Sequence, residues 1–165
     1  MRELTSEITS ARVVLTCGVS GSGKTCLAKA LEEHGFIRVS ADELAWRRYG
    51  GDFTSLPWSG QQELFGEVRD EIDAELESLL TRGCKVVVDS TMCKRGRRQT
   101  VREICRRHGV EPLLVFLDAG YETLRDRLAS RQGKGPNDIV IPDARLREFC
   151  SNFESPGSDE PYVRL

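Results

Sequence analysis

The chain has 165 residues, which is enough for one domain with a buried core, and we expect a single domain over 1–165. Apolar residues make up 39% and charged residues 30%, and the formal net charge of -2 excludes a strong overall attraction to nucleic acid. No apolar run approaches the roughly 18 residues that span a bilayer, and residues 1–7 lack the apolar region of a secretory signal. We therefore expect a cytoplasmic protein that does not contact the membrane.

The first predicted element is a strand over residues 13–17 that runs straight into a glycine-rich loop. The segment VVLTCGVSGSGKT (residues 13–25) ends in the pattern G-x-x-x-x-G-K-[ST]. So short a pattern also occurs by chance in surface turns. Here an apolar strand precedes it and a helical stripe of apolar residues follows over 24–34, which favours a loop that binds a nucleoside triphosphate.

Each residue type in this loop has a physical role in holding phosphate. Glycines let the backbone turn tightly with N–H groups directed inward, and the following helix presents its positive end to the anion. Lys24 is expected to reach the β- and γ-phosphates, and the Thr25 hydroxyl to bind Mg²⁺. The predicted nucleotide-binding residues are Gly18, Ser20, Gly21, Ser22, Gly23, Lys24, Thr25 and Cys26.

A second strand is predicted over residues 36–39, followed by a helix over 41–49 that opens with the capping box Ser40-Ala-Asp-Glu43. Asp42 follows the strand at the edge of the sheet where α/β proteins bind their ligands. There it could accept the proton of an attacking hydroxyl group as a general base. An acid in the first turn of a helix also stabilises that helix, so the residues alone leave both roles open.

The loop over 50–60 is long enough to move and is a candidate lid. Its flanking aromatic side chains could stack on a base or sugar, although a hydrophobic cover over helix packing is the commoner role. These residues are Trp46, Tyr49, Phe53 and Trp58. An S-x-x-Q signal at 59–62 predicts the start of a long amphipathic helix, which ends in a basic turn and a glycine at 82–83.

A third strand is predicted over 85–89 and ends in an acid. Four strand residues followed by Asp89 resemble a Walker-B motif, whose acid holds Mg²⁺ directly or through water. An Asp can also close a strand as a turn residue, but the phosphate-binding loop nearby favours a metal or substrate role. Thr91 either supports the same site or caps the next helix.

A basic run begins before a helix predicted over 96–108, and a fourth strand is predicted over 113–118. Such runs are usually solvated helix faces. The alternative is a basic wall beside a phosphate-bearing substrate. The cations of the run are Lys94, Arg95, Arg97, Arg98, Arg102, Arg106 and Arg107.

The last predicted helix, over 121–131, leads into a second long loop at 132–142, which is another candidate lid. Arg127 and Arg131 are four residues apart and share a helix face. Arginines delivered by a closing lid can stabilise the charge on a transferring phosphoryl group. The alternative for Arg127 is a solvated pair with a nearby acid.

Strands alternate with helices along the chain, which predicts right-handed βαβ crossovers and a parallel sheet covered on both faces. The six cysteines fall singly, with no C-x-x-C pair and no His at ligand spacing. We therefore expect neither a zinc site nor a disulfide framework.

Taken together, these motifs resemble small P-loop kinases over about residues 12–156. The likeness is strongest to the kinase domain of polynucleotide 5′-hydroxyl kinases and their "predicted kinase" relatives, with zeta-toxin and antibiotic phosphotransferases as more distant cousins. The segments that carry it are Gly18–Thr25, Ser40–Asp42, Asp89–Arg98, Arg127–Arg131 and Phe153–Pro156. Where polynucleotide kinases tend to carry an arginine one helical turn after the base, this chain has Ala45.

The resemblance implies a three-layer P-loop NTPase fold of adenylate-kinase type, with a central parallel sheet of about five strands and a helical lid. It implies that Lys24 and Thr25 hold ATP and Mg²⁺ and that Asp42 is the general base. It also implies that Arg131 contacts the phosphates with the assistance of Arg127. Asp89 joins Thr25 as the second predicted metal residue.

The expected function is an ATP-dependent kinase that transfers the γ-phosphate to a hydroxyl acceptor. A 5′-hydroxyl of a nucleic acid or nucleotide is the first acceptor class, and a metabolite or antibiotic hydroxyl is the second. A nucleotide-binding switch or ATPase module is a third hypothesis, against which the chain has no guanine-specifying N-K-x-D motif. The expected partners are ATP and the hydroxyl-bearing substrate.

Overall fold

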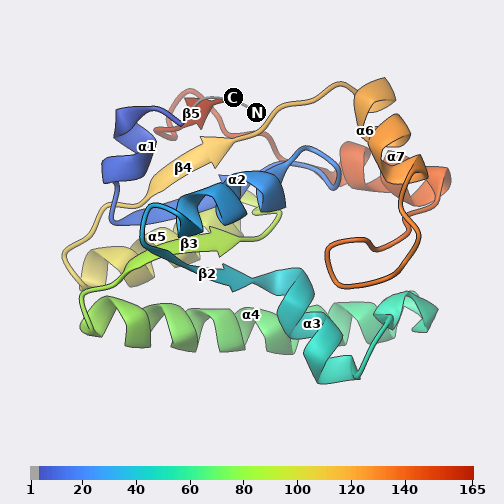
Figure 1. Cartoon of the computed structure of the whole chain (residues 1–165), viewed down its shortest axis with the longest axis horizontal. Helices are drawn as coiled ribbons and strands as arrows, with labels where there is room; N and C mark the ends of the chain where they lie inside the picture. The colour runs from blue at the N-terminus through green and yellow to red at the C-terminus, as the bar shows by residue number, and fades with distance from the viewer. Residues whose placement is uncertain (1–3) are drawn as a thin grey trace.

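The strands of the central sheet are the apolar runs of the sequence. The computed structural model describes residues 4–165, so residues 1–3 of the segment considered for a secretory signal lie outside it. All strand pairs are parallel, and their order across the sheet is β2-β3-β1-β4-β5 (Figure 1). The strands are β1 (Val13–Cys17), β2 (Phe36–Ser40), β3 (Lys85–Asp89), β4 (Leu113–Phe116) and β5 (Val163–Arg164).

The strands at the centre are buried on both faces because helices cover both sides of the sheet. Every residue of β1 is buried, as a parallel strand between two helical layers requires. One layer consists of α1 (Ser6–Ser10) and α2 (Lys24–Glu32), whose apolar side chains pack on alternate strand residues. The other consists of α3 (Ala41–Tyr49), α4 (Trp58–Thr81) and α5 (Arg95–Arg107). The predicted three-layer α/β fold is confirmed.

Two further helices stand beyond the carboxyl ends of the strands, at the right of Figure 1. They are α6 (Tyr121–Ala129) and α7 (Asp143–Asn152), and they share a small apolar cluster of Leu124, Leu128 and Leu146. The chain between them forms a long loop on the same side of the molecule as the carboxyl ends of the strands. Among the described residues, no helix is long and apolar enough to cross a membrane.

The register brings the strand ends together at this side of the sheet. Ser40, the last residue of β2, pairs with Asp89, the last residue of β3. Cys17, the last residue of β1, pairs with Phe116 of β4. The residues that directly follow β1, β2 and β3 therefore lie at one edge, which is the position of ligand sites in parallel sheets.

Several predicted element boundaries were wrong, each for a local reason. The predicted cap at Ser59 lies inside α4, which begins at Trp58 because Pro57 is the N-cap and fixes an extended backbone there. The helix predicted to reach residue 131 ends at Ala129. The resemblance implies about five strands, but α1, α7 and β5 were not located from the residues; α1 and β5 are too short to show a period.

Candidate active site

The loop between β1 and α2 has a conformation that only glycine adopts easily. Gly18, Gly21 and Gly23 have φ of 150°, 87° and 105°. A Cβ on Gly18 would lie 2.6 Å from both the Leu117 carbonyl oxygen and the Ser22 hydroxyl, so this position also has no room for a side chain. The loop closes onto the start of α2, whose first N–H groups have no carbonyl partner within the helix and can bind an anion.

Lys24 lies at the start of α2 and is buried. Its Nζ donates to the Val19 carbonyl oxygen at 3.0 Å, which holds the ammonium group over the loop. Burial lowers the pKa of Lys24, and the charges of Asp42 and Asp89 act in the opposite direction. The structure thus brings both predicted acids within electrostatic range of this lysine.

Asp89 and Thr25 form a pair of oxygen ligands beside the loop. Thr25 Oγ1 donates to Asp89 Oδ1 at 3.4 Å, and the side chain of Asp89 is only 4% exposed. Burial raises the pKa of Asp89, whereas Lys24 and Arg38 lower it. A hydroxyl and a carboxylate side by side are hard oxygen donors that fit Mg²⁺, so these residues suit the predicted metal site.

Asp42 lies in the first turn of α3, whose N-cap Ser40 accepts the Glu43 N–H at 3.4 Å. Burial raises the pKa of Asp42 to about 6, and the charge of Lys24 opposes that shift. Asp89 raises it further and Arg131 lowers it. Asp42 therefore has the helix position of a stabilising acid and also lies within the electrostatic reach of the phosphate-binding loop.

The two predicted lid arginines make different contacts. Arg127 is exposed, and its Nη1 donates to the carbonyl oxygens of Gly21 at 3.0 Å and Ser22 at 3.4 Å. Arg131 lies past the end of α6, and its Nη1 donates to the Ile139 carbonyl oxygen at 3.2 Å within the long loop. Arg127 thus touches the phosphate-binding loop directly, whereas Arg131 organises the loop that follows it.

The other predicted site residues differ in their surroundings. Ser20 is half-buried in the phosphate-binding loop, and Cys26 is exposed in the first turn of α2. Thr91 supports the loop through its backbone, because its carbonyl oxygen accepts the Gly18 N–H at 3.1 Å. The alternative that Thr91 caps the next helix was wrong, since Lys94 is the N-cap of α5.

Two of the four aromatic residues around the first loop, Phe53 and Trp46, cover helix packing, whereas Tyr49 and Trp58 are exposed. Phe53 is 4% exposed and meets Phe65 edge-on, with ring centroids 5.2 Å apart. Trp46 packs against the same core. Trp58 is 43% exposed, and the Arg145 guanidinium lies 3.8 Å from its ring centroid.

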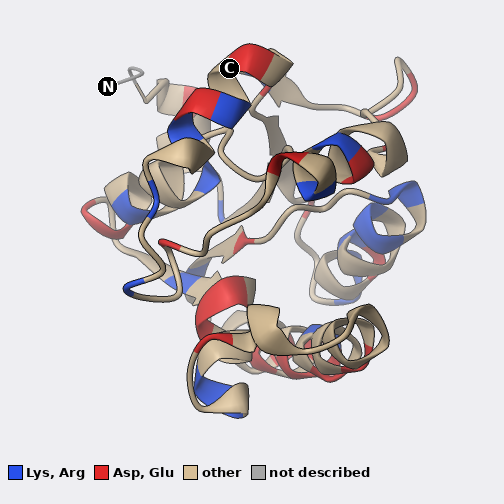
Figure 2. Ribbon diagram, turned by 90° about the vertical axis from the view of Figure 1, so that its right-hand side faces the viewer, with Lys and Arg blue, Asp and Glu red and all other residues tan. Residues whose placement is uncertain are grey.

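Every cation of the basic run has an acidic partner in the described part of the chain. Figure 2 shows acidic and basic segments intermixed over the ribbon. Arg98 and Arg102 are buried, so the predicted solvated face was wrong for these two residues, and both contact Glu160. The other pairs are Lys94–Glu154, Arg95–Asp159, Arg97–Asp73, Arg106–Glu111 and Arg107–Glu77. Each cation is therefore held in an ion pair, with Arg98 and Arg102 sharing one carboxylate, so the run does not present a wall of free cations.

Three polar residues of the site were missed from the sequence. Arg38 of β2 donates to Asp89 Oδ2 at 3.1 Å and also pairs with Glu43. Asn137 of the long loop donates through Nδ2 to Glu43 Oε1 at 2.9 Å. The only available signal was an arginine inside an otherwise apolar strand, because the other contacts join segments far apart in the sequence.

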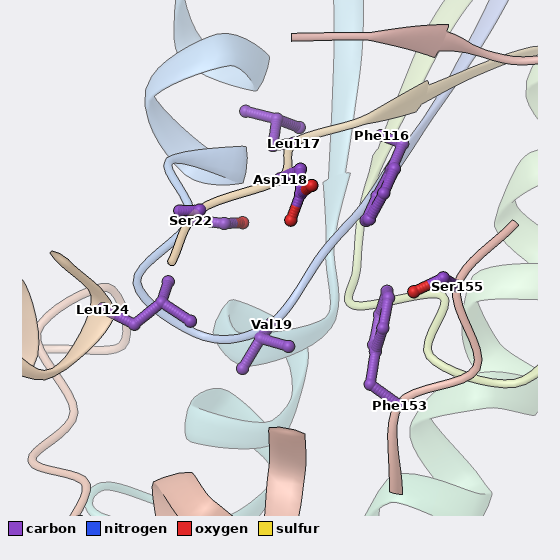
Figure 3. Close-up of a pocket in the computed structure, with 9 residues that line it drawn as sticks. Val19, Ser22, Phe116, Leu117, Asp118, Leu124, Phe153 and Ser155 are labelled. Carbon is purple, nitrogen blue, oxygen red and sulfur yellow. The ribbon is translucent and has the colours of Figure 1, made fainter. Parts of the chain in front are cut away.

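A cavity of 60 Å³ lies behind the phosphate-binding loop (Figure 3). Val19 and Ser22 line one side, and Phe116 and Phe153 line the other with their rings stacked 5.8 Å apart. The Ser22 hydroxyl is buried and has no hydrogen-bond partner among the described residues. The cavity is large enough for a few water molecules only.

The sequence profile of the AAA domain family matches residues 13–156. A gluconokinase from Sinorhizobium meliloti is 23% identical with a TM-score of 0.62, over 93% of this chain and 81% of that chain. Kti12 from Chaetomium thermophilum, solved with ADP–AlF3, is 18% identical with a TM-score of 0.70, over 93% and 88%. A chain of the Pnkp1/Rnl/Hen1 RNA repair complex is 19% identical with a TM-score of 0.67, over 85% and 43%. No curated protein sequence matches the chain.

Proposed function

The chain belongs to the AAA domain family and has the fold of small P-loop kinases, and from this premise we propose that it transfers the γ-phosphoryl group of ATP to a hydroxyl acceptor. The observation that carries the proposal is the placement of Asp42 near Lys24. Asp42 is half-buried and has a pKa of about 6. A pKa near the working pH suits a group that accepts a proton, whereas an acid that stabilises a helix does so through its charge. This acid favours transfer over a module that only binds nucleotide.

In the proposed reaction, the loop N–H groups and Lys24 hold the phosphates and neutralise their charge. Mg²⁺, held by Thr25 and Asp89, would supply further neutralisation of the phosphate oxygens. The acceptor oxygen forms a bond to the γ-phosphorus while the bond from that phosphorus to the β–γ bridging oxygen breaks, and ADP leaves. Asp42 accepts the hydroxyl proton, and Arg127 and Arg131 stabilise the transferring group.

Two acceptor classes remain in the proposal. A 5′-hydroxyl of a nucleotide or nucleic acid is the first, in line with the likeness to the RNA repair chain. A small-molecule hydroxyl is the second, in line with the likeness to gluconokinase. The fully paired basic run favours the second class, because a long polyanion is usually held by several unneutralised cations.

The test is transfer of label from γ-labelled ATP to a panel of acceptors: oligonucleotides with free 5′ ends, nucleosides, sugars and aminoglycosides. Oligonucleotides already phosphorylated at the 5′ end are the matched control. Labelling of a free 5′ end that weakens steeply with salt supports the first class, and salt-tolerant labelling of a small molecule supports the second. Release of labelled phosphate with no labelled acceptor in the panel would contradict the proposal and favour an ATPase.

A further inference from the structure

Arg38 is the centre of an ion-pair network behind the proposed metal site. Its side chain is 8% exposed although it lies in the middle of β2. Nη1 donates to Asp89 Oδ2 at 3.1 Å, Nη2 pairs with Glu43, and Nε lies 3.6 Å from a Glu32 carboxylate oxygen. One guanidinium therefore contacts three carboxylates that come from three different elements.

The contact fixes the direction of the Asp89 carboxylate. Its Oδ2 is held by Arg38 and its Oδ1 by the Thr25 hydroxyl at 3.4 Å. With both oxygens held, the carboxylate cannot rotate away from Thr25 without breaking a buried charged contact. Outer residues that orient a metal ligand in this manner commonly change metal affinity by about 10–100-fold when they are removed.

The second arm of the network reaches the long loop between α6 and α7. Glu43, which directly follows Asp42, accepts from Asn137 Nδ2 at 2.9 Å. Asn137 Oδ1 is buried and has no hydrogen-bond partner among the described residues, so the Glu43 contact determines the orientation of this amide. Arg38 also pairs with Glu43, so this carboxylate joins Arg38 to Asn137.

We propose that Arg38 is a positioning residue that holds Asp89 beside Thr25 and connects it, through Glu43 and Asn137, to the loop over 130–142. Binding of a magnesium nucleotide at Thr25 and Asp89 then favours the position of this loop in which Asn137 contacts Glu43. The inference rests on the proposed nucleotide site. It adds Arg38 as a residue that orients the proposed metal ligand Asp89. If Arg38 had a purely structural role, its substitution would lower stability without changing the effect of Mg²⁺ on nucleotide binding.

The test uses the full chain and measures binding of ADP with and without Mg²⁺ by calorimetry. In Arg38→Gln, we expect the strengthening of ADP binding by Mg²⁺ to fall about tenfold or more. Arg38→Lys keeps a positive charge that can reach one of the three carboxylates and should recover part of the effect. The matched control is Arg97→Gln, because Arg97 also forms a partly buried pair, with Asp73 at 2.6 Å, on the face between α4 and α5.

A second readout follows the loop itself through trypsin cleavage after the exposed Lys134, measured by mass spectrometry. We expect Mg²⁺·ADP to slow this cleavage severalfold in the wild-type protein and in Arg97→Gln, but not in Arg38→Gln. Asn137→Ala should likewise remove the protection while leaving the fold intact, since Asn137 lies in a loop. This variant keeps the test available if Arg38→Gln does not fold.

Equal magnesium effects and equal loop protection in wild type and in the variants would overturn the inference. Absence of Mg²⁺·ADP binding to the wild-type protein would overturn it as well. The acceptor assay run on the same protein separates the two proposals. If Arg38→Gln loses the magnesium effect while wild type labels no acceptor, the kinase proposal fails and the role of Arg38 stands.

Discussion

Two clusters of charged residues, one around Glu160 and one around Asp42, differ in how many hydrogen bonds from cations their carboxylates accept. At the junction of α5 with the C-terminal segment, Glu160 accepts from Arg98 at 2.6 and 2.8 Å and from Arg102 at 3.0 Å. The Arg98 hydrogen bonds lower the pKa of Glu160 to about 2. At the phosphate-binding edge, burial instead raises the pKa of Asp42 to about 6.

The difference lies in the donors that each carboxylate receives. Within the described residues, Asp42 accepts no hydrogen bond from a cationic side chain, although Lys24 and Arg131 are near enough to lower its pKa. A buried acid with full pairing is held ionised and contributes to stability, whereas an incompletely paired acid is able to exchange a proton. The comparison distinguishes a hydrogen-bonded buried acid from an acid without a cationic hydrogen-bond donor, and we propose that the second one is the site of the chemistry.

Among the variants that compare the two clusters, the first expected effect is a large loss of turnover in Lys24→Met. The substitution removes the charge on the phosphates with little change in side-chain volume, and we expect phosphoryl transfer to fall about 10³-fold. Because burial already disfavours the charged form of Lys24, thermal stability should stay the same or rise. Labelled-ATP transfer and thermal melting, measured on the same preparation, check both parts.

The matched variant in the cluster around Glu160 is Arg98→Met. Its melting temperature should fall strongly, while the folded fraction retains nucleotide binding. An Arg98→Met protein that is stable but inactive, or a Lys24→Met protein that is unstable but active, would break the distinction between the two clusters.

The next effect is on stability and comes from Glu160→Gln. The variant leaves Arg98 and Arg102 buried without a counter-charge, so we expect a loss of about 3–5 kcal/mol in the free energy of unfolding. Urea denaturation at pH 7 measures it. In the wild-type protein, the contribution of Glu160 is present above pH 4.5 and is lost as the pH falls toward about 2. A loss near zero at pH 7 would contradict the structural role of this cluster.

The smallest expected effect is a gain in stability in Asp42→Asn. The folded pKa of about 6 lies above the ordinary value of 3.8, so the folded wild-type protein loses stability as the pH rises through this interval. Asn cannot ionise, and we expect the variant to be more stable by about 1–2 kcal/mol at pH 7.5. The gain should shrink as the pH is lowered toward 4. A variant less stable than wild type at pH 7.5 would mean that Asp42 serves mainly to stabilise α3.

The phosphate-binding loop could be predicted because its residues are consecutive and its glycines are required by the backbone. Asp42 and Asp89 could be placed because Asp89 is the last residue of β3 and Asp42 lies in the first turn of the helix that follows β2, and parallel strands end at one edge. The partners of the basic run could not be predicted, since Arg98 meets Glu160 across 62 positions of the sequence. The contacts of Arg38 with Asp89 and of Asn137 with Glu43 were missed for the same reason, since they join residues 51 and 94 positions apart. The Arg38–Glu43 contact is close in sequence, but it joins a strand to the following helix, and no single period describes both.

The most direct test of the central claim compares wild type with Asp42→Asn in a single experiment. ATP binding is measured by calorimetry, and transfer of the γ-phosphate to the acceptor identified in the panel is measured with labelled ATP. We expect nearly unchanged ATP affinity and a loss of transfer of about 10²–10⁴-fold, since only the proton acceptor has been removed. Transfer at the wild-type rate by Asp42→Asn would contradict the assignment of Asp42 as the general base.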